Sequence, residues 1–196
     1  MIGLKTEKII LGVDPGTSIM GFGIIKVVGK KMEFVQMNEL VLKKYKDPYI
    51  KLKLIFERTI ELIDTYHPDE MALEAPFFGK HVQSMLKLGR AQGVAMAAGL
   101  SRSIPVTEYA PLKIKMAITG NGKSSKEQVA LMLKSLLNLK TLPKNLDATD
   151  GLAAAVCHFY NSGTKVGGKN YTGWASFVKQ NPKKAQPSSP KGRERK

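Results

Sequence analysis

The chain has 196 residues, 43% of them hydrophobic, which suffices for one globular body with a buried core. Its 31 lysines and arginines outnumber 16 acids and give a net charge of +15, which favours a polyanionic partner, because basic side chains that neutralise phosphates release counterions. The single cysteine, Cys157, excludes an intramolecular disulfide and a cysteine-based zinc cluster, and is consistent with a reducing cytosol.

The sequence contains no recognisable signal peptide and no uninterrupted apolar stretch of about 18 residues, the length that a transmembrane helix requires. We therefore expect a cytoplasmic protein without a membrane partner.

The first strands are predicted within residues 8–42. Residues 8–14 form a continuous, β-branched apolar run typical of a buried strand. Residues 21–29 and 32–42 predict two further strands, and the turn at 29–31 has the length of a hairpin connection. We therefore expect these strands to form an antiparallel meander.

Helices alternate with single strands in the rest of the body. The patterns predict, in chain order, a helix over 48–66, a strand over 70–74, a helix over 82–101, a strand over 105–109, a helix from 124 to about 139 and a final helix that opens at Asp147. The first helix carries an apolar stripe at helical spacing: Leu52, Phe56, Ile60 and Ile63. Ser124, with Glu127 three residues later, matches a capping box. This order indicates an α/β fold with a mixed sheet covered by helices.

Residues 163–196 differ in composition from the body. They hold nine lysines and arginines against the single acid Glu194, a net charge of +8. Prolines and serines replace most aliphatic residues, so this segment should not fold alone. We expect a globular body over 1–162 and a basic C-terminal tail over 163–196.

Four carboxylates stand where predicted elements end or begin. Asp14 ends the first strand before the breaker pair Pro15-Gly16, and Glu74 ends the strand over 70–74. Asp147 and Asp150 open an alanine-rich segment and, being three residues apart, lie on one face of a helix. Because open α/β sheets place ligands at the carboxyl ends of their strands, we expect these side chains to converge.

Converging carboxylates repel one another and are costly to bury unless a cation lies between them. Mg²⁺ prefers hard oxygen ligands and retains water molecules for reaction. Two such ions about 4 Å apart can clamp a phosphodiester, so the set predicts a magnesium site that cuts nucleic acid. Structural interpretations remain open: Asp147 suits a helix N-cap and Asp14 a turn, whereas Glu74 is harder to explain as structure.

Further motifs accompany these acids in a fixed order along the chain. They are Gly12-Val-Asp14-Pro-Gly16, Gly21-Phe-Gly23, Leu73-Glu74 with Phe77, Lys87-Leu-Gly-Arg-Ala-Gln-Gly-Val94 and Asp147-Ala-Thr-Asp150-Gly-Leu-Ala-Ala-Ala. In this combination the chain closely resembles the RuvC family of bacterial Holliday junction resolvases, from about Ile9 to Asn161.

The resemblance implies a ribonuclease H-like nuclease domain over 1–162, built on a mixed five-stranded sheet flanked by helices. It implies a homodimer that resolves Holliday junctions in DNA recombination and repair by paired symmetric nicks in two strands of the four-way junction. It also implies two Mg²⁺ ions in each active site, with Mn²⁺ able to substitute, and cooperation with the branch-migration proteins RuvA and RuvB.

The resemblance also assigns roles to particular residues. The family's catalytic, metal-binding acids fall on Asp14, Glu74, Asp147 and Asp150. The aromatic residue that meets DNA near the active site falls on Phe77, and basic residues important for catalysis or DNA contact fall on Lys115 and Lys126.

The loop after Glu74 departs from the family pattern, with Ala75-Pro76 and with His81 where many members have Asn. Phe77 and Phe78 follow the proline directly, so we expect at least one of them to be exposed. Stacking on an unpaired base is favoured for Phe77, whereas for Phe78 a hydrophobic plug beneath the loop is favoured over stacking. Basic residues in and after this loop can meet backbone phosphates or belong to a solvated surface: Lys80, Lys87 and Arg90.

The predicted helix over 82–101 is rich in small residues: Gly89, Ala91, Gly93, Ala95, Ala97, Ala98 and Gly99. Glycine within a helix costs up to about 1 kcal/mol, so these residues indicate close packing against the sheet or against a second subunit. The residues alone do not choose between the two, and the resemblance favours a dimer contact.

Other functions compete with junction cleavage. A sugar kinase or actin-like ATPase shares a strand followed by a motif such as Asp14-Pro-Gly-Thr17, but it needs duplicated domains and a second phosphate loop. A ribonuclease H-like nuclease acting on RNA would use the same acids. A non-catalytic DNA-binding module would share the basic charge, yet it has no need of four acids near phosphates.

Overall fold

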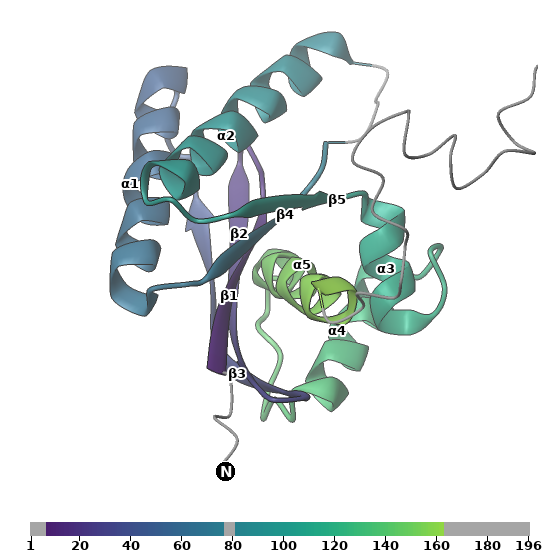
Figure 1. Cartoon of the computed structure of the whole chain (residues 1–196). Helices are drawn as coiled ribbons and strands as arrows, with labels where there is room; N and C mark the ends of the chain where they lie inside the picture. The colour runs from purple at the N-terminus through teal and green to yellow at the C-terminus, as the bar shows by residue number, and fades with distance from the viewer. Residues whose placement is uncertain (1–6, 77–80, 163–196) are drawn as a thin grey trace, which may run out of the picture. The chain divides into compact units, whose positions relative to one another are not determined.

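The computed structural model describes residues 7–76 and 81–162, which contain a five-stranded sheet in the order β3-β2-β1-β4-β5 (Figure 1). The strands are β1 (Glu7–Asp14), β2 (Ile19–Val28), β3 (Lys31–Val41), β4 (Glu70–Glu74) and β5 (Val106–Tyr109). β1, β2 and β3 form the expected antiparallel meander, whereas β4 and β5 run parallel to β1. The predicted mixed sheet is confirmed.

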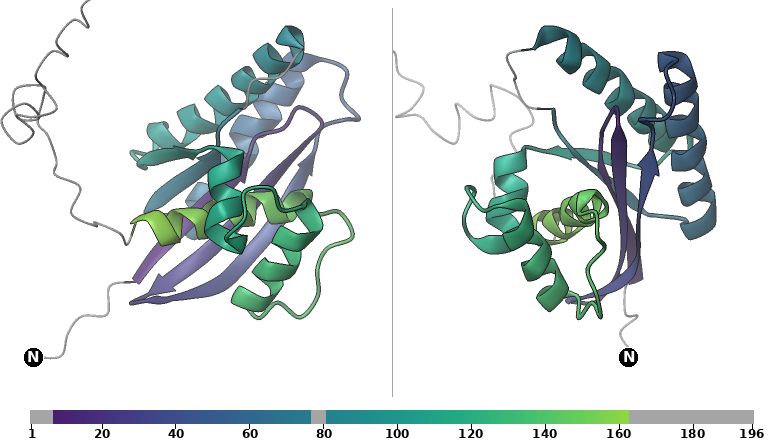
Figure 2. Two further views of the ribbon diagram at one scale, coloured as in Figure 1. Left: turned by 90° about the vertical axis from the view of Figure 1, so that its right-hand side faces the viewer. Right: turned by 180° about the vertical axis from the view of Figure 1, so that it is seen from behind.

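Helices cover both faces of this sheet: α1 (Pro48–Tyr66), α2 (Val82–Ser101), α3 (Pro111–Thr119), α4 (Lys126–Leu136) and α5 (Asp147–Ser162). Figure 2 shows α1 and α2 on one face and α3, α4 and α5 on the other. Alternating strand residues supply a core to each layer: Leu11 and Phe22 pack toward α1 and α2, and Ile10 and Ile25 pack toward α5. None of the described helices is long and apolar enough to span a membrane.

Glycines in β1 and β2 let α5 lie directly on the sheet. A Cβ atom at Gly12 would lie 2.1 Å from the carbonyl oxygen of Gly151, and one at Gly21 would lie 2.1 Å from that of Asp147. Contacts this short are impossible for any larger residue. The glycines therefore set the depth at which the first turn of α5 meets β2.

Three local predictions are wrong, one of them only in part. The sequence did not predict α3, whose nine residues separate β5 from α4. The capping box is formed by Ser125 and Gln128, one residue later than expected. The predicted stripe of α1 is correct only in part: Ile63 is buried and Leu52 packs against the core, whereas Phe56 is 40% exposed. The fully buried residues of α1 are Ile55, Thr59, Leu62 and Ile63.

The chain divides into two units, Met1–Gly163 and Thr164–Lys196. α5 ends at Ser162, close to the end of the predicted body. The predicted tail over 163–196 lies outside the described residues, so its character stays a prediction.

Candidate active site

Asp14 and Glu74 leave the sheet side by side. β1 and β4 are parallel neighbours, and their register pairs Val13 with Leu73, the residues directly before the two acids. Adjacent strands lie about 4.8 Å apart, so both carboxylates emerge at the same edge. The convergence predicted for these two acids is therefore present.

The first turn of α5 brings Asp147 and Asp150 to the same edge. Asp14 pairs with Gly21 across β1 and β2, and Gly21 lies against the backbone of Asp147. A cavity of about 190 Å³ opens here, between the sheet edge and α3, α4 and α5. Its charged lining residues are Asp14, Glu74, Asp150, Lys115 and Lys126, and its apolar wall consists of Pro111, Ile114, Val129 and Ala153.

Burial and mutual repulsion raise the pKa values of the acids that line this cavity. Burial, followed by the charges of Glu74 and Asp150, raises the pKa of Asp14 well above its usual value. Burial, followed by the charge of Asp150, raises the pKa of Glu74 to about 7. Burial likewise raises the pKa of Asp150, against the opposing effect of Lys126. The cavity thus carries more negative charge than the surrounding protein neutralises.

Lys126, the first residue of α4, neutralises part of that charge. Its Nζ atom donates to Oδ1 of Asp147 at 2.5 Å and to Oδ2 of Asp150 at 2.6 Å. The hydrogen bond from Lys126 lowers the pKa of Asp147. Burial by itself would lower the pKa of Lys126, but its hydrogen bonds to Asp147 and Asp150 outweigh burial and raise that pKa. The family resemblance assigned Lys126 to this site, and so did its place among the lysines around Gly120-Asn-Gly122.

The donor set suits a hard divalent cation. Among residues 7–76 and 81–162, no three Asp, Glu, His or Cys side chains are arranged as a ready set of metal ligands. The ammonium group of Lys126 instead bonds two of the four acids. Carboxylate oxygens are the ligands that Mg²⁺ prefers, and the excess negative charge at Asp14 and Glu74 would fall when a cation binds.

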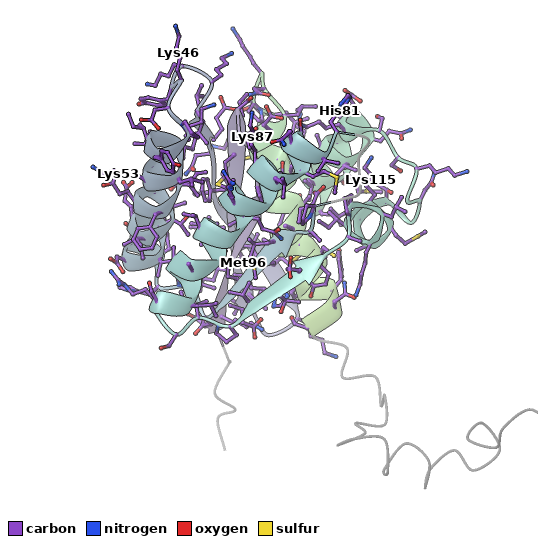
Figure 3. All side chains as sticks on the ribbon, turned by 90° about the horizontal axis from the view of Figure 1, so that it is seen from above. Lys46, Lys53, His81, Lys87, Met96 and Lys115 are labelled. Atoms are coloured by element: carbon purple, nitrogen blue, oxygen red, sulfur yellow. The ribbon has the colours of Figure 1, made fainter. Side chains whose placement is uncertain are left out.

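Some predicted site residues cannot be placed. Phe77, Phe78 and Lys80 lie outside the described residues. A smaller cavity of about 60 Å³ beside the acids is lined by Asp14, Pro15, Glu74, Ala75, Pro76, Leu88 and Pro111. Figure 3 looks onto this end of the sheet and shows Lys115 on the α3 side and His81 at the start of α2.

The family model described as crossover junction endodeoxyribonuclease RuvC matches residues 10–158. The chain belongs to the RuvC family. The RuvC protein of Christiangramia forsetii is 80% identical over 181 residues, covering 92% of this chain and 94% of the relative. That of Bacteroides fragilis is 58% identical over 188 residues, covering 95% and 100%.

A solved RuvC structure shares the fold. Thermus thermophilus RuvC in complex with a Holliday junction substrate superimposes with a TM-score of 0.73 at 28% identity, covering 79% of this chain and 94% of that chain. The expected ribonuclease H-like class is thus confirmed, with its mixed sheet flanked by helices. As a member of this family, the chain is a crossover junction endodeoxyribonuclease that acts in DNA recombination and repair. Enzymes of the RuvC family depend on a divalent metal ion.

Proposed function

We propose that this chain resolves Holliday junctions by paired, symmetric nicks in two strands, using Mg²⁺ held by Asp14, Glu74, Asp147 and Asp150. One observation carries the proposal: three of these acids line a single cavity together with two lysines, and burial raises the pKa of all three. A cavity that concentrates carboxylates inside a chain of net charge +15 has little structural purpose without a bound cation.

The acids would hold two Mg²⁺ ions, with Mn²⁺ able to substitute, because both ions accept carboxylate oxygens. Such ions, when bound, supply Lewis-acid stabilisation of the charge on a phosphodiester and lower the pKa of a bound water molecule. Asp14 and Glu74 contribute from a rigid sheet edge, and Asp150 contributes from a helix packed onto that sheet. This rigid support holds the carboxylates ready before DNA arrives.

Lys115 and Lys126 would contact the phosphate that is cut. Both line the cavity from the helical side, Lys115 from α3 and Lys126 from α4. When a cation binds the carboxylate of Asp150, Lys126 would be free to turn from Asp150 toward the phosphate. The cation would then neutralise Asp150, and the ammonium group of Lys126 would neutralise the phosphate. Cationic groups fixed beside a reacting phosphate stabilise its developing charge.

Phe77, Phe78 and Lys80 would contact DNA beside the cut. Their segment follows Pro76, which lines the smaller cavity together with Asp14 and Glu74. Phe77 is suited to stack on an unpaired base at the junction centre, a contact worth about 1–3 kcal/mol. Lys80 would meet the backbone phosphate of that nucleotide.

The outward face of α2 supports a homodimer. Val82, Leu86 and Leu100 are 66%, 53% and 58% exposed, and they recur on one face with Gly89, Gly93 and the exposed Ala97. A Cβ atom at Gly89 or Gly93 would meet nothing within 4 Å. The buried small residues, such as Ala95 and Gly99, face the sheet instead. The helix thus has one small-residue face for the sheet and another for a second subunit.

A two-fold dimer would present two active sites to a junction that is itself roughly two-fold, which accounts for symmetric nicks. We further propose that the dimer acts with RuvA and RuvB, a partnership that membership of the family supports.

A nicking assay on synthetic DNA tests this function. The chain should nick a four-way junction in two opposed strands with Mg²⁺ or Mn²⁺, leave linear duplex of the same sequence intact, and do nothing in chelator. Equal cutting of junction and duplex, or full activity in chelator, would contradict the proposal. An RNA–DNA hybrid in the same assay distinguishes a nuclease that acts on RNA.

A further inference from the structure

A second, larger cavity lies on the other face of the sheet. It measures about 410 Å³ and is formed where the start of α1 meets α2. Its basic lining residues are Lys46, Lys51, Lys87 and Arg90, and none of the described residues that line it is an acid. Figure 3 shows Lys46 at the start of α1 and Lys87 on α2. We call these four side chains and the space between them the basic cavity.

The charge of the basic cavity is not neutralised within the described part of the chain. Lys46, Lys87 and Arg90 form no ion pair there, whereas Arg102 on the same helix layer is paired with Asp64. The neighbouring Asp47 caps α1, accepting hydrogen bonds from the backbone nitrogens of Tyr49 and Ile50. Cations left together without counter-charge repel one another, so their grouping favours an anionic ligand.

One of these cations is fixed in place. Lys51 donates from Nζ to the backbone oxygen of Thr17 at 3.0 Å. That bond anchors the ammonium group at the wall of the cavity, against the loop that follows Asp14. A lysine held in this way is better prepared to bind an anion than one that is free in solvent.

The basic cavity lies close to the proposed cleavage site. Thr17 lines it and is three residues from Asp14, so their Cα atoms are at most about 11 Å apart. On α2, Lys87 lines the basic cavity, while the next residue, Leu88, lines the small cavity beside Asp14 and Glu74. Each DNA strand carries one phosphate per about 3.4 Å of helix axis, so the separation between Thr17 and Asp14 corresponds to at most about three nucleotides.

We propose that the basic cavity binds backbone phosphates of a DNA arm, a few nucleotides from the phosphate that is cut. The proposal rests on the proposed junction-cleaving function. DNA is the occupant that the charge favours, because several cations around one cavity match a chain of phosphates better than a single small anion. These residues hold and orient the substrate and take no part in hydrolysis.

The test compares two double variants of the full-length protein that lose the same charge. Lys87→Gln/Arg90→Gln alters the basic cavity. Lys30→Gln/Lys31→Gln alters the exposed turn between β2 and β3, at the opposite end of the sheet from Asp14. Binding of a labelled four-way junction is measured by fluorescence anisotropy in chelator over a series of salt concentrations. Cleavage is measured separately with Mg²⁺ at saturating protein.

The basic-cavity variant should bind the junction at least tenfold more weakly at physiological salt. Its plot of log K against log salt should flatten by about 1.8, since each lost phosphate contact contributes about 0.9. The control variant should change either quantity little, and both variants should cleave bound junction within about twofold of the wild-type rate. Equal losses in the two variants would overturn the proposal, because they would show only a response to net charge.

A change from dimer to monomer in the basic-cavity variant alone would also overturn it, by assigning this surface to a subunit contact. If that variant does not fold, the same measurements are made on Lys46→Gln/Lys87→Gln, whose two altered side chains are exposed. Binding in chelator and cleavage with Mg²⁺ are separate measurements, so the two proposals can fail separately. A wild-type protein that binds junctions but does not cut them with Mg²⁺ would contradict the proposed function and leave this inference standing.

Discussion

The ammonium nitrogen of Lys126 lies 2.6 Å from Oδ2 of Asp150, at the wall of the cavity that Asp14 and Glu74 also line. A side chain of the protein thus supplies positive charge where the proposed metal ions would. Binding of metal to Asp150 must compete with this ion pair.

Replacing Lys126 should therefore tighten metal binding. Lys126→Met should lower the dissociation constant for Mn²⁺ roughly two- to fivefold in the absence of DNA, since a partly exposed ion pair contributes up to ~1 kcal/mol. Isothermal titration calorimetry measures this affinity. Lys115→Met is the matched control, because Lys115 lines the same cavity and forms no ion pair with a described residue. Equal tightening in both variants would show that only the charge of the cavity matters.

The raised pKa of Glu74 predicts a pH-dependent stability of the metal-free protein. A carboxyl whose pKa rises from 4.5 when unfolded to about 7 when folded binds its proton more tightly in the folded state. Below pH 4.5 Glu74 is protonated in both states, so its ionisation does not change the free energy of unfolding. As the pH rises from 4.5 to about 7, ionisation of Glu74 lowers the free energy of unfolding by an order of 1–3 kcal/mol.

Urea denaturation in chelator at pH 5 and pH 8 measures this loss. Glu74→Gln should be less sensitive to pH than the wild type, and Mg²⁺ should stabilise the wild type more at pH 8 than at pH 5. Identical pH profiles for the wild type and Glu74→Gln would refute the assignment.

Gly21 should tolerate no larger residue. A Cβ atom there would lie 2.1 Å from the carbonyl oxygen of Asp147, so Gly21→Ala must move the first turn of α5 away from β2. We expect a loss of about 2 kcal/mol or more in the free energy of unfolding and weaker metal binding. Chemical denaturation compares Gly21→Ala with the wild type, and an unchanged free energy of unfolding would contradict this account of the contact between α5 and β2.

The proposed dimer can be tested with two exposed leucines. Leu86 on α2 is 53% exposed and Leu131 on α4 is 60% exposed, so neither should be needed for the fold of the monomer. Leu86→Glu should convert a dimer into a monomer, while Leu131→Glu should not, as judged by light scattering after size exclusion. A dimer that survives Leu86→Glu would place the subunit contact elsewhere.

Features of the sheet were predictable because each rests on local sequence. A continuous apolar run marked β1, and the strand ends marked Asp14 and Glu74. Convergence of these two acids follows from the parallel pairing of β1 with β4, which no single segment encodes. It could be anticipated only from the general rule for ligands at strand ends.

Helix details were less predictable because neighbouring signals compete. Adjacent serines each have a possible capping partner three residues later, and the fold selects the pair Ser125 and Gln128. α3 was missed although Pro111 begins it and Gly120, with φ of +72°, ends it, two signals that are typical of a helix. Because α3 has only nine residues, its apolar periodicity is too short to stand out.

Contacts between helices were not predictable. The bonds from Lys126 to Asp147 and Asp150 depend on how α4 packs beside α5, and the four side chains of the basic cavity come from the approach to α1, α1 itself and α2. Lys126 was assigned to the site from the sequence, but its two carboxylate partners were not. Lys46 and Lys51 look in the sequence like ordinary solvated charges, and only their placement around a cavity separates them from the remaining cations.

Junction binding and cleavage by Asp14→Asn test the central claim most directly. The variant should bind a synthetic four-way junction within about threefold of the wild type while cleaving it more than about 100-fold more slowly with Mg²⁺, since even changes to the partners of metal ligands cost about 10–100-fold. Cleavage at the wild-type rate would show that a carboxylate at the end of β1 takes no part in the reaction.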